Sequence, residues 1–263
     1  MQKVVQRVMP RCPRGAGASL RPGGITLPSM EETLAASTLC VGVLTGPRTS
    51  FQVSHRGADA WHLRAPSAPL GVSLLSPRAV RFPQGLVVSH LPTGCPEVSA
   101  GEGALWYDDR RVTVSRWLNP PNVLGRHRHR LRPSKGVESD RLASKWRSRL
   151  GRGEGLTPYG DDVLCGALLG LLASGDPRGR WLAGEIRGTD LRAHTTATSA
   201  VLLRCAADGW CLPELDDVLQ TIRRGRPDAV AVSRLLAVGH SSGHGLLTGL
   251  GTVLDLELGL AAA

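Results

Sequence analysis

The hydrophobic pattern of this chain changes at Asn119-Pro120-Pro121-Asn122, and that change limits the folds available to it. A double proline can continue neither a central strand nor the interior of a helix. Before it, short apolar runs are separated by Gly, Pro and other turn residues, which is typical of strands. After it, apolar residues recur with helical spacing. The sequence therefore predicts an α+β protein, with a small antiparallel β barrel or sandwich followed by a C-terminal helical domain.

The expected elements follow from these two patterns. The predicted strands are Leu39–Leu44, Ser50–His55, Ala60–Leu63, Val72–Leu75, Gly85–His90, Ala104–Tyr107 and Val112–Trp117. We expect Asp108-Asp109 to form a hairpin turn between the last two. The predicted helices are Ser139–Leu150, Asp161–Ala173, Thr195–Ala207, Glu214–Arg224, Asp228–Ala237 and Leu246–Leu258. Gly166 and Gly170, four residues apart, predict a close contact between helices.

These patterns divide the chain into four segments. Residues 1–30 contain no acidic residue and many Gly and Pro, and we expect a disordered basic leader. Residues 31–118 form the expected β-rich domain, and residues 119–138 a basic linker rich in Pro and Arg. Residues 139–263 form the expected helical domain, which contains a glycine-rich GLTPYGDD loop.

The net charge of +10 is unevenly distributed. Residues 110–152 hold 13 basic and 2 acidic residues, and Arg126, Arg128, Arg130 and Arg132 alternate there with His or Leu. Such a run either neutralises phosphates and attracts an anionic substrate or is a solvated linker. It is accompanied by no helix-turn-helix pattern, zinc-finger spacing or aromatic platform. We therefore do not expect nucleic-acid binding.

Several features argue for a cytoplasmic protein. The chain has no run of about 18 apolar residues, which argues against a membrane span. Its first 30 residues lack the apolar core of a signal peptide. Six cysteines show no CxxC spacing, and we expect them to be buried free thiols in a reducing compartment.

The stretch Gly151–Asp162, GRGEGLTPYGDD, is the strongest candidate for a functional loop because it leads directly into an apolar helix. Glycines such as Gly155 and Gly160 let a ligand approach the backbone, and free N–H groups at a helix start favour an anion. Asp161 and Asp162 fall in the first turn, where either could be a general base or a magnesium ligand. Because adjacent residues diverge by about 100° on a helix, only one can face a site. The alternative is that they only cap the helix.

Two further polar stretches precede apolar helices. Thr195, Thr196 and Ser199 could project hydroxyls toward the first loop, or could form a simple N-cap. In GHSSGHGLLTG, Ser242 and Gly243 could bind an oxyanion, and His240 and His244 are candidates for acid–base catalysis or are ordinary surface histidines. If the three helix starts lie together, they form one polar pocket for an anion.

The ordered motifs GEGLTPYGDDVLCGALLGLL, HTTATSAVLLRCAADG and GHSSGHGLLTGL resemble the AllH-like family, a subunit of oxamate carbamoyltransferase in anaerobic allantoin breakdown. The resemblance covers about residues 139–258, and the first motif is its most specific part. It implies a subunit of an assembly that transfers a carbamoyl group between oxamate and phosphate, together with an FdrA-type partner. The matched positions are Thr157, Gly160, Asp161, Asp162, Thr195, Thr196, Ser199, Ser242 and Gly243.

The resulting hypothesis is a cytoplasmic transferase subunit that binds a small anionic carbamoyl or phosphate compound. Asp161, Asp162 and His244 are its candidate catalytic residues, and Asp161 and Asp162 would hold a metal such as magnesium if one is needed. The candidate substrate-binding residues are Gly155, Thr157, Gly160, Thr195, Thr196, Ser199, Ser242 and Gly243. Two alternatives remain: a non-catalytic subunit that docks onto a partner, and a stand-alone metal-assisted hydrolase.

Overall fold

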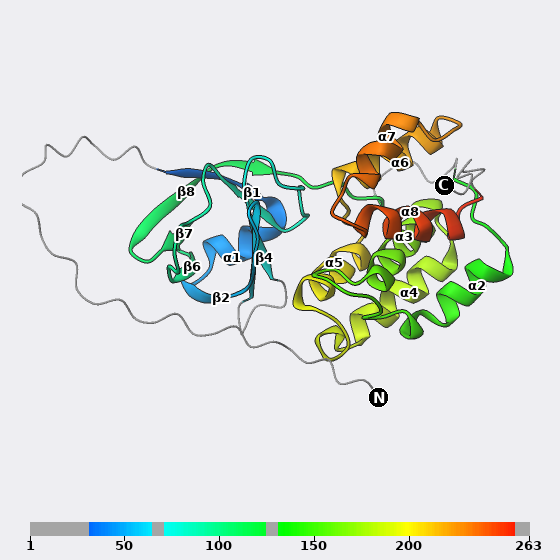
Figure 1. The fold of residues 1–263 in the computed structure, drawn as a ribbon, viewed down its shortest axis with the longest axis horizontal. Helices are drawn as coiled ribbons and strands as arrows, with labels where there is room; N and C mark the ends of the chain where they lie inside the picture. Colours follow the sequence, from blue (N-terminus) through cyan, green and yellow to red (C-terminus); the bar gives the residue numbers. More distant parts are fainter. Residues whose placement is uncertain (1–31, 65–70, 125–130, 256–263) are drawn as a thin grey trace, which may run out of the picture.

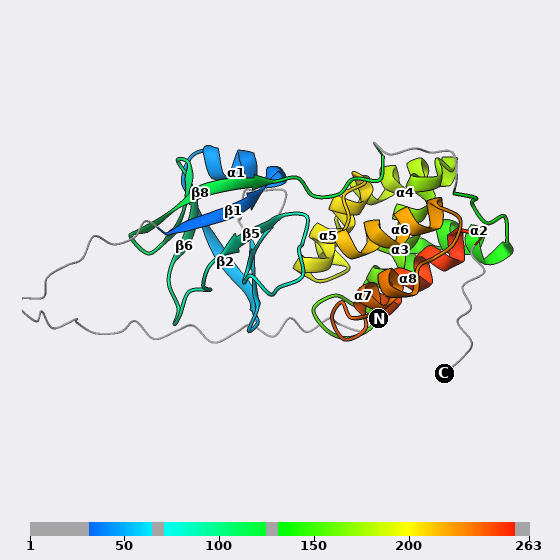
Figure 2. The same cartoon turned by 90° about the horizontal axis from the view of Figure 1, so that it is seen from above.

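The structure, a computed structural model, describes residues 32–64, 71–124 and 131–255. It consists of a β barrel and a helical part that lie side by side along the longest axis (Figure 1 and Figure 2). The connection between them follows the last strand of the barrel and contains the double proline. The expected leader at residues 1–30 and most of the arginine–histidine run, residues 126–130, lie outside the described residues.

Among the described residues, eight strands close into one barrel in the order β1-β5-β4-β3-β2-β6-β7-β8. Their bounds are β1 Thr33–Ser37, β2 Thr49–Arg56, β3 Ala60–Arg64, β4 Val72–Leu75, β5 Gly85–Val88, β6 Val98–Gly101, β7 Ala104–Tyr107 and β8 Arg110–Leu118. The closed barrel replaces the alternative of a sandwich. Its strands are not all antiparallel, because β1 pairs with β8, and β4 with β5, in parallel.

The expected strand at Leu39–Leu44 is wrong. A short 3-10 turn and helix α1 (Val41–Thr45) occupy this stretch, and Cys40 and Leu44 are both buried because they lie four residues apart on one helical face. Strands β1 and β6 were not predicted, because they contain small residues instead of β-branched runs. The hairpin turn at Asp108-Asp109 is confirmed, with Asp108 at a φ of 52° between β7 and β8.

The helices of the second part are α2 Val137–Ser144, α3 Tyr159–Ser174, α4 Pro177–Gly188, α5 Ala197–Ala207, α6 Pro213–Arg223, α7 Ala229–Leu236 and α8 Ser242–Val253. The expected helix Ser139–Leu150 divides into α2 and a 3-10 turn at Trp146–Ser148. Helix α4 was missed because Pro177 resembles a stop signal. It is instead the first residue of a helix whose N-cap, Asp176, accepts from the backbone N–H of Arg178.

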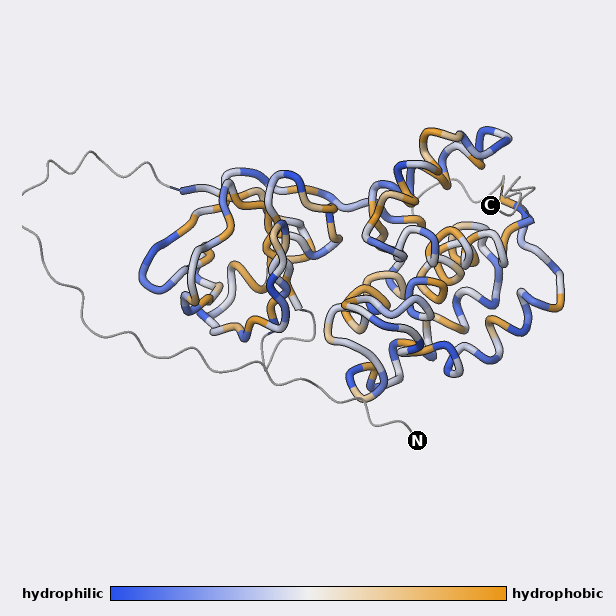
Figure 3. The backbone as a smooth tube through the Cα atoms, in the orientation of Figure 1, coloured by the Kyte–Doolittle hydropathy of each residue, from blue (hydrophilic) through white to orange (hydrophobic). Residues whose placement is uncertain are grey.

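Helices α3 and α8 form the centre of the helical part. Helix α3 is buried continuously from Gly160 to Ala173, and hydrophobic residues gather in the middle of this part (Figure 3). A Cβ atom at Gly166 would lie 2.0 Å from the carbonyl oxygen of Leu246, and one at Gly249 would lie 2.0 Å from that of Val163. The predicted close contact between helices is therefore confirmed, and it sets the position of the α8 N-terminus against that of α3.

The barrel and the helices share a buried boundary. Val80 and Phe82, from the connection between β4 and β5, pack against the hydrophobic core of the helical part. The thiol of Cys205 on α5 donates to the side-chain oxygen of Gln84 at 3.7 Å. The barrel is therefore held against the face on which α5 lies.

Four cysteines are free and buried as expected, and a fifth is not. Cys40, Cys165, Cys205 and Cys211 are free and buried, as expected. Cys95, which is exposed, is disulfide-bonded, so the expectation of a free buried thiol is wrong there. Within the described residues, no helix is both long and apolar enough to span a membrane.

Candidate functional site

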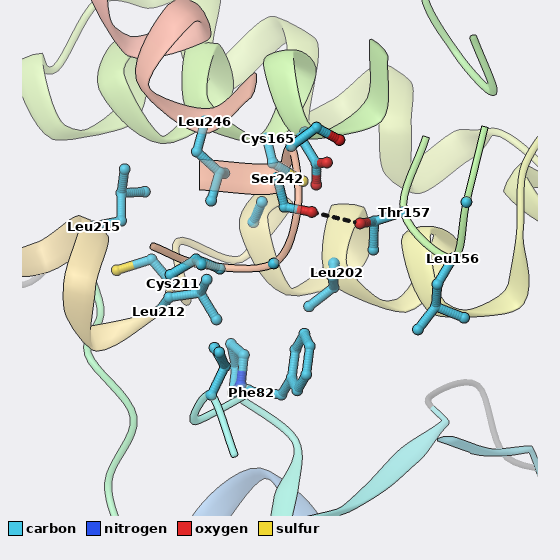
Figure 4. A pocket seen from close by; sticks show the side chains of 18 of the residues that line it. Phe82, Leu156, Thr157, Cys165, Leu202, Cys211, Leu212, Leu215, Ser242 and Leu246 are labelled. Carbon is cyan, nitrogen blue, oxygen red and sulfur yellow. Dashed lines mark hydrogen bonds between the residues drawn. The ribbon is translucent and has the colours of Figure 1, made fainter. Parts of the chain in front are cut away.

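A cavity of about 710 Å³ lies between the barrel and the helices (Figure 4). The loop before α3 and the loop before α8 form its polar side, and the β4–β5 connection contributes its barrel side. Its lining residues include Asp59, His62, Val80, Phe82, Glu154, Gly155, Leu156, Thr157, Tyr159, Asp162, Leu202, Leu212, His240, Ser242 and Leu246. The glycine-rich loop therefore borders a space that is large enough for a ligand.

The loops before α3 and α8 touch through their side chains. The hydroxyls of Thr157 and Ser242 form a hydrogen bond of 2.8 Å, which is drawn in Figure 4. Close by, the phenol of Tyr159 and the hydroxyl of Thr248 form another of 3.0 Å. Two segments that are 85 residues apart in the sequence therefore meet at one point of the cavity wall.

The start of α5 joins the same region. Thr196 caps α5 by accepting from the backbone N–H of Ser199 at 3.1 Å, and its hydroxyl donates to the carbonyl oxygen of Leu156 at 2.6 Å. The predicted N-cap therefore also anchors the glycine-rich loop. Together with the Thr157–Ser242 contact, this hydrogen bond confirms that the three helix starts converge.

Asp161 is turned away from the cavity and is held by its neighbours. One carboxylate oxygen accepts from the backbone N–H of Gly151 at 2.7 Å, and the other accepts from the hydroxyl of Thr195. Burial raises the pKa of Asp161, and the bonds from Gly151 and Thr195, helped by the Ser199 hydroxyl, partly offset that rise. The carboxylate joins the loop to the segment before α5.

Asp162 lines the cavity and has a different environment. Its Oδ2 atom is buried and has no hydrogen-bond partner among the described residues. Burial raises the pKa of Asp162 to about 7, although the nearby hydroxyls of Ser242 and Thr157 favour the charged form, and the charge of Asp161 adds to the rise. As expected, only one of the two adjacent carboxylates faces the site, and Asp162 is the one that does.

The expected cradle of free backbone amides is not present at two of its positions. The N–H of Gly160 donates to the carbonyl oxygen of Arg152 at 2.8 Å, and that of Gly243 donates to the carbonyl oxygen of Val238 at 2.9 Å. Both donors lie in the first turn of their helix, and their acceptors are carbonyl oxygens of the segments that precede α3 and α8. Gly155 lines the cavity and is exposed.

The charged side chains that line the cavity do not favour the binding of the expected anion. Asp59, Glu154 and Asp162 are among the described lining residues, and none of those residues is Lys or Arg. An anion in the cavity would therefore meet carboxylates without a compensating cation from the described lining. Binding of a small anion stays a prediction.

The two histidines of the third motif lie in different places. His244 is exposed in the first turn of α8 and is not among the described residues that line the cavity. His240, also exposed, does line it. The proposed catalytic role of His244 would therefore need a group that reaches it from outside the cavity.

The donors do not favour a metal between the two aspartates. Both carboxylate oxygens of Asp161 already accept hydrogen bonds within the chain, which leaves Asp162 as the free carboxylate. Across the described ranges, no group of three or more His, Cys, Asp or Glu residues could hold a metal ion. The pair does not form a ready magnesium site, and we derive no step through a metal.

Sequence reasoning missed the barrel side of the cavity. His62 and Phe82 line it, although they lie in the half of the chain in which no functional residue was expected. One signal was available: in Ala60–Arg64, alternation sets His62 on the opposite face from the apolar Trp61 and Leu63. A buried polar residue on the outer face of a barrel indicates that another part of the protein covers it.

Part of the chain is similar to a known protein family. The sequence model of the family described as "Oxamate carbamoyltransferase subunit AllH" matches residues 149–254. The matched range begins just before the glycine-rich loop and ends just after α8, so it contains all three converging loops. It does not include the barrel. No solved structure matches the chain.

Proposed function

We propose that this chain is a subunit of a carbamoyltransferase that acts in allantoin breakdown, because residues 149–254 match the sequence model of the AllH family. Within that subunit, the cavity binds the carbamoyl group of the substrate beside Asp162. The observation that carries the proposal is the buried, unpartnered Oδ2 atom of Asp162 at the point where the three loops converge.

The hydrogen-bonding groups around Asp162 are complementary to a carbamoyl group. An NH₂ group has two N–H donors and its carbonyl one acceptor oxygen, and a buried carboxylate oxygen without a partner is a strong acceptor. Thr157 and Ser242 have one hydroxyl hydrogen each, and one of the two is used in the bond between them. The other lies beside the Asp162 carboxyl group in the free protein and turns to donate to the carbonyl oxygen of the ligand. The uncharged carbamoyl group therefore lies against Asp162, and the anionic part of oxamate or carbamoyl phosphate lies toward the open side of the cavity.

Asp162 is also the group that can exchange a proton. A pKa of about 7 is well matched to general acid–base chemistry at neutral pH. When a nitrogen attacks the carbamoyl carbon, the new N–C bond forms, phosphate leaves with the electron pair of the broken C–O bond, and the nitrogen loses a proton. In this proposal the Asp162 carboxylate accepts that proton, while Asp161 holds the loop in place.

The proposal includes a partner. The family description names a subunit, and the resemblance implies an FdrA-type protein that completes the enzyme. Positive charge would strengthen the binding of the anionic part of the substrate, and the described lining residues do not provide it. The partner would supply it at the open side of the cavity.

Calorimetric titration of the chain with oxamate, carbamoyl phosphate and inorganic phosphate at pH 7 tests the binding step. We expect the wild type to bind a carbamoyl compound and Asp162→Asn to lose at least tenfold in affinity. Asp217→Asn, which neutralises an exposed carboxylate on α6 outside the cavity, is the matched control and should bind like the wild type. Equal affinity in Asp162→Asn, or no binding of either carbamoyl compound by the wild type, would contradict the proposal.

A further inference from the structure

The barrel wall of the cavity contains a polar residue that the family match does not include. On β3, the side chains of Trp61 and Leu63 belong to the barrel core, so His62 points out of the barrel. It is nevertheless only 5% exposed, because the helical part covers this face. His62 therefore lies on the boundary between the two parts and lines the cavity from the barrel side.

The imidazole of His62 is fixed in position. Its Nδ1 atom is hydrogen-bonded to the hydroxyl of Ser73 at 2.9 Å, and its ring packs edge-on against Phe82 with 5.2 Å between the ring centroids. Burial, together with the charge of His55, lowers the pKa of His62 to about 4, so the ring is neutral at pH 7. Its Nε2 atom has no hydrogen-bond partner within the described part of the chain.

Between this wall and Asp162 the cavity is apolar. Figure 4 shows Phe82 across the cavity from the Thr157–Ser242 pair, with Leu202 and Leu212 between them. Cavities of roughly 300–1,000 Å³ hold drug-sized ligands. A volume of about 710 Å³ therefore leaves most of the cavity unfilled when a compound as small as oxamate occupies the polar side.

We propose that the cavity accepts carbamoyl or amide compounds that have an uncharged, apolar body, which extends from Asp162 to the barrel wall. There, His62 Nε2 offers a second hydrogen bond to the far end of the ligand. The inference rests on the proposed function for one point, the position of the carbamoyl group beside Asp162. It adds that the substrate class is broader than small anions and that the barrel is part of the site.

A series of neutral primary amides tests the apolar part of the inference. Acetamide, butyramide and hexanamide present the same head group to Asp162 and differ only in the length of their apolar tails. We expect affinity, measured by calorimetry, to increase about fourfold for each CH₂ group that enters the cavity. Equal affinity for all three amides would overturn the inference.

Diamides test the contact with His62. Among straight-chain diamides with four to eight carbons, we expect at least one to bind more tightly than the monoamide of the same length. That advantage should be lost in His62→Phe, which keeps an aromatic ring beside Phe82, whereas the affinity for hexanamide should change little. If no diamide shows such an advantage, His62 does not contact the ligand.

Nuclear magnetic resonance of the wild type avoids any dependence on the folding of that variant. With ¹⁵N-labelled histidine, hexanamide should shift the Nε2 resonance of His62, and acetamide should leave it unchanged. An Nε2 resonance unaffected by any of these amides would overturn the inference.

Asp162→Asn separates the two proposals. If this variant loses amide binding while the wild type binds all chain lengths equally, the inference fails and the proposed function stands. If affinity increases with chain length and Asp162→Asn has no effect, the position of the carbamoyl group fails, and the proposed function fails with it.

Discussion

Asp161 and Asp162 are adjacent in the sequence, but their carboxyl groups lie in two different environments. On one side, Asp161 lies among Gly151, Thr195 and Ser199, and both of its oxygens are hydrogen-bonded. On the other, Asp162 faces the cavity beside Thr157 and Ser242, with a buried oxygen that has no partner among the described residues. We refer to these as the Asp161 side and the Asp162 side.

The difference teaches which buried carboxylate holds the fold and which is available to a ligand. A buried carboxylate whose hydrogen bonds are made within the chain stabilises local structure. One that lacks a partner costs free energy in the empty protein, and a ligand that supplies a donor recovers that cost. The adjacent residues therefore have separable roles, and each of the following predictions compares the two sides.

The largest expected effect is on the Asp161 side. Asp161→Ala removes the acceptor for the Gly151 N–H and the Thr195 hydroxyl, which are then left without their partner. We expect this variant to lose about 3 kcal/mol in the free energy of unfolding, measured by urea denaturation. A loss no greater than that of the exposed control Asp217→Ala would show that Asp161 does not hold the loop.

The second prediction concerns the pH dependence of the Asp162 side. The folded state raises the pKa of Asp162 to about 7. At pH values between the ordinary pKa of a carboxyl group and about 7, the protein therefore takes up a proton at Asp162 when it folds. The stabilising contribution is fully present below the unfolded pKa and is lost as pH increases through about 7. Between pH 5 and pH 8 the wild type should lose about 2 kcal/mol more stability than Asp162→Asn.

Denaturation curves at both pH values, on both proteins, measure that difference. The titration of His62 changes stability in the opposite direction, because folding lowers the pKa of His62. The contribution of His62 to stability is present above its unfolded pKa and is lost as pH falls toward about 4. If the wild type and Asp162→Asn lose the same stability between pH 5 and pH 8, the carboxyl group of Asp162 has an ordinary pKa.

The smallest expected effect comes from one substitution made on each side. Thr195→Val removes a hydroxyl that donates to the Asp161 carboxylate. Thr157→Val removes one that is bonded to the neutral hydroxyl of Ser242 and lies beside Asp162, a carboxyl group that is partly protonated at pH 7. Since hydrogen bonds to charged groups contribute more, we expect losses of about 2 kcal/mol for Thr195→Val and about 0.5 kcal/mol for Thr157→Val in urea denaturation. The reverse order would contradict the division into two sides.

Much of the fold and part of the site could be predicted from local patterns. Helical spacing located α3, and the glycines of α3 indicated its close packing. The carboxylates of Asp161 and Asp162 were expected to face different directions, because adjacent residues on a helix point about 100° apart. Local patterns failed where short segments lacked strong signals: β1 and β6 are rich in small residues, and Pro177 marks a start of α4 that resembles a stop.

The rest of the site depends on contacts between distant segments, and no local pattern encodes them. Which aspartate faces the cavity is decided by Gly151 and Thr195, the latter 34 residues away from Asp161. The amides of Gly160 and Gly243 were expected to be free, and both donate to carbonyl oxygens of the segments before the helices. His62 and Phe82 reach the site only because the barrel packs against α5 and its neighbours.

The most direct test of the central claim is a ¹³C nuclear magnetic resonance titration of the Asp162 carboxyl carbon between pH 4 and pH 9, with and without acetamide, a neutral ligand. We predict a pKa near 7 in the free protein and a lower one with acetamide bound, because the N–H donors of the amide favour the charged carboxylate. An ordinary carboxyl pKa that acetamide does not change would contradict the central claim.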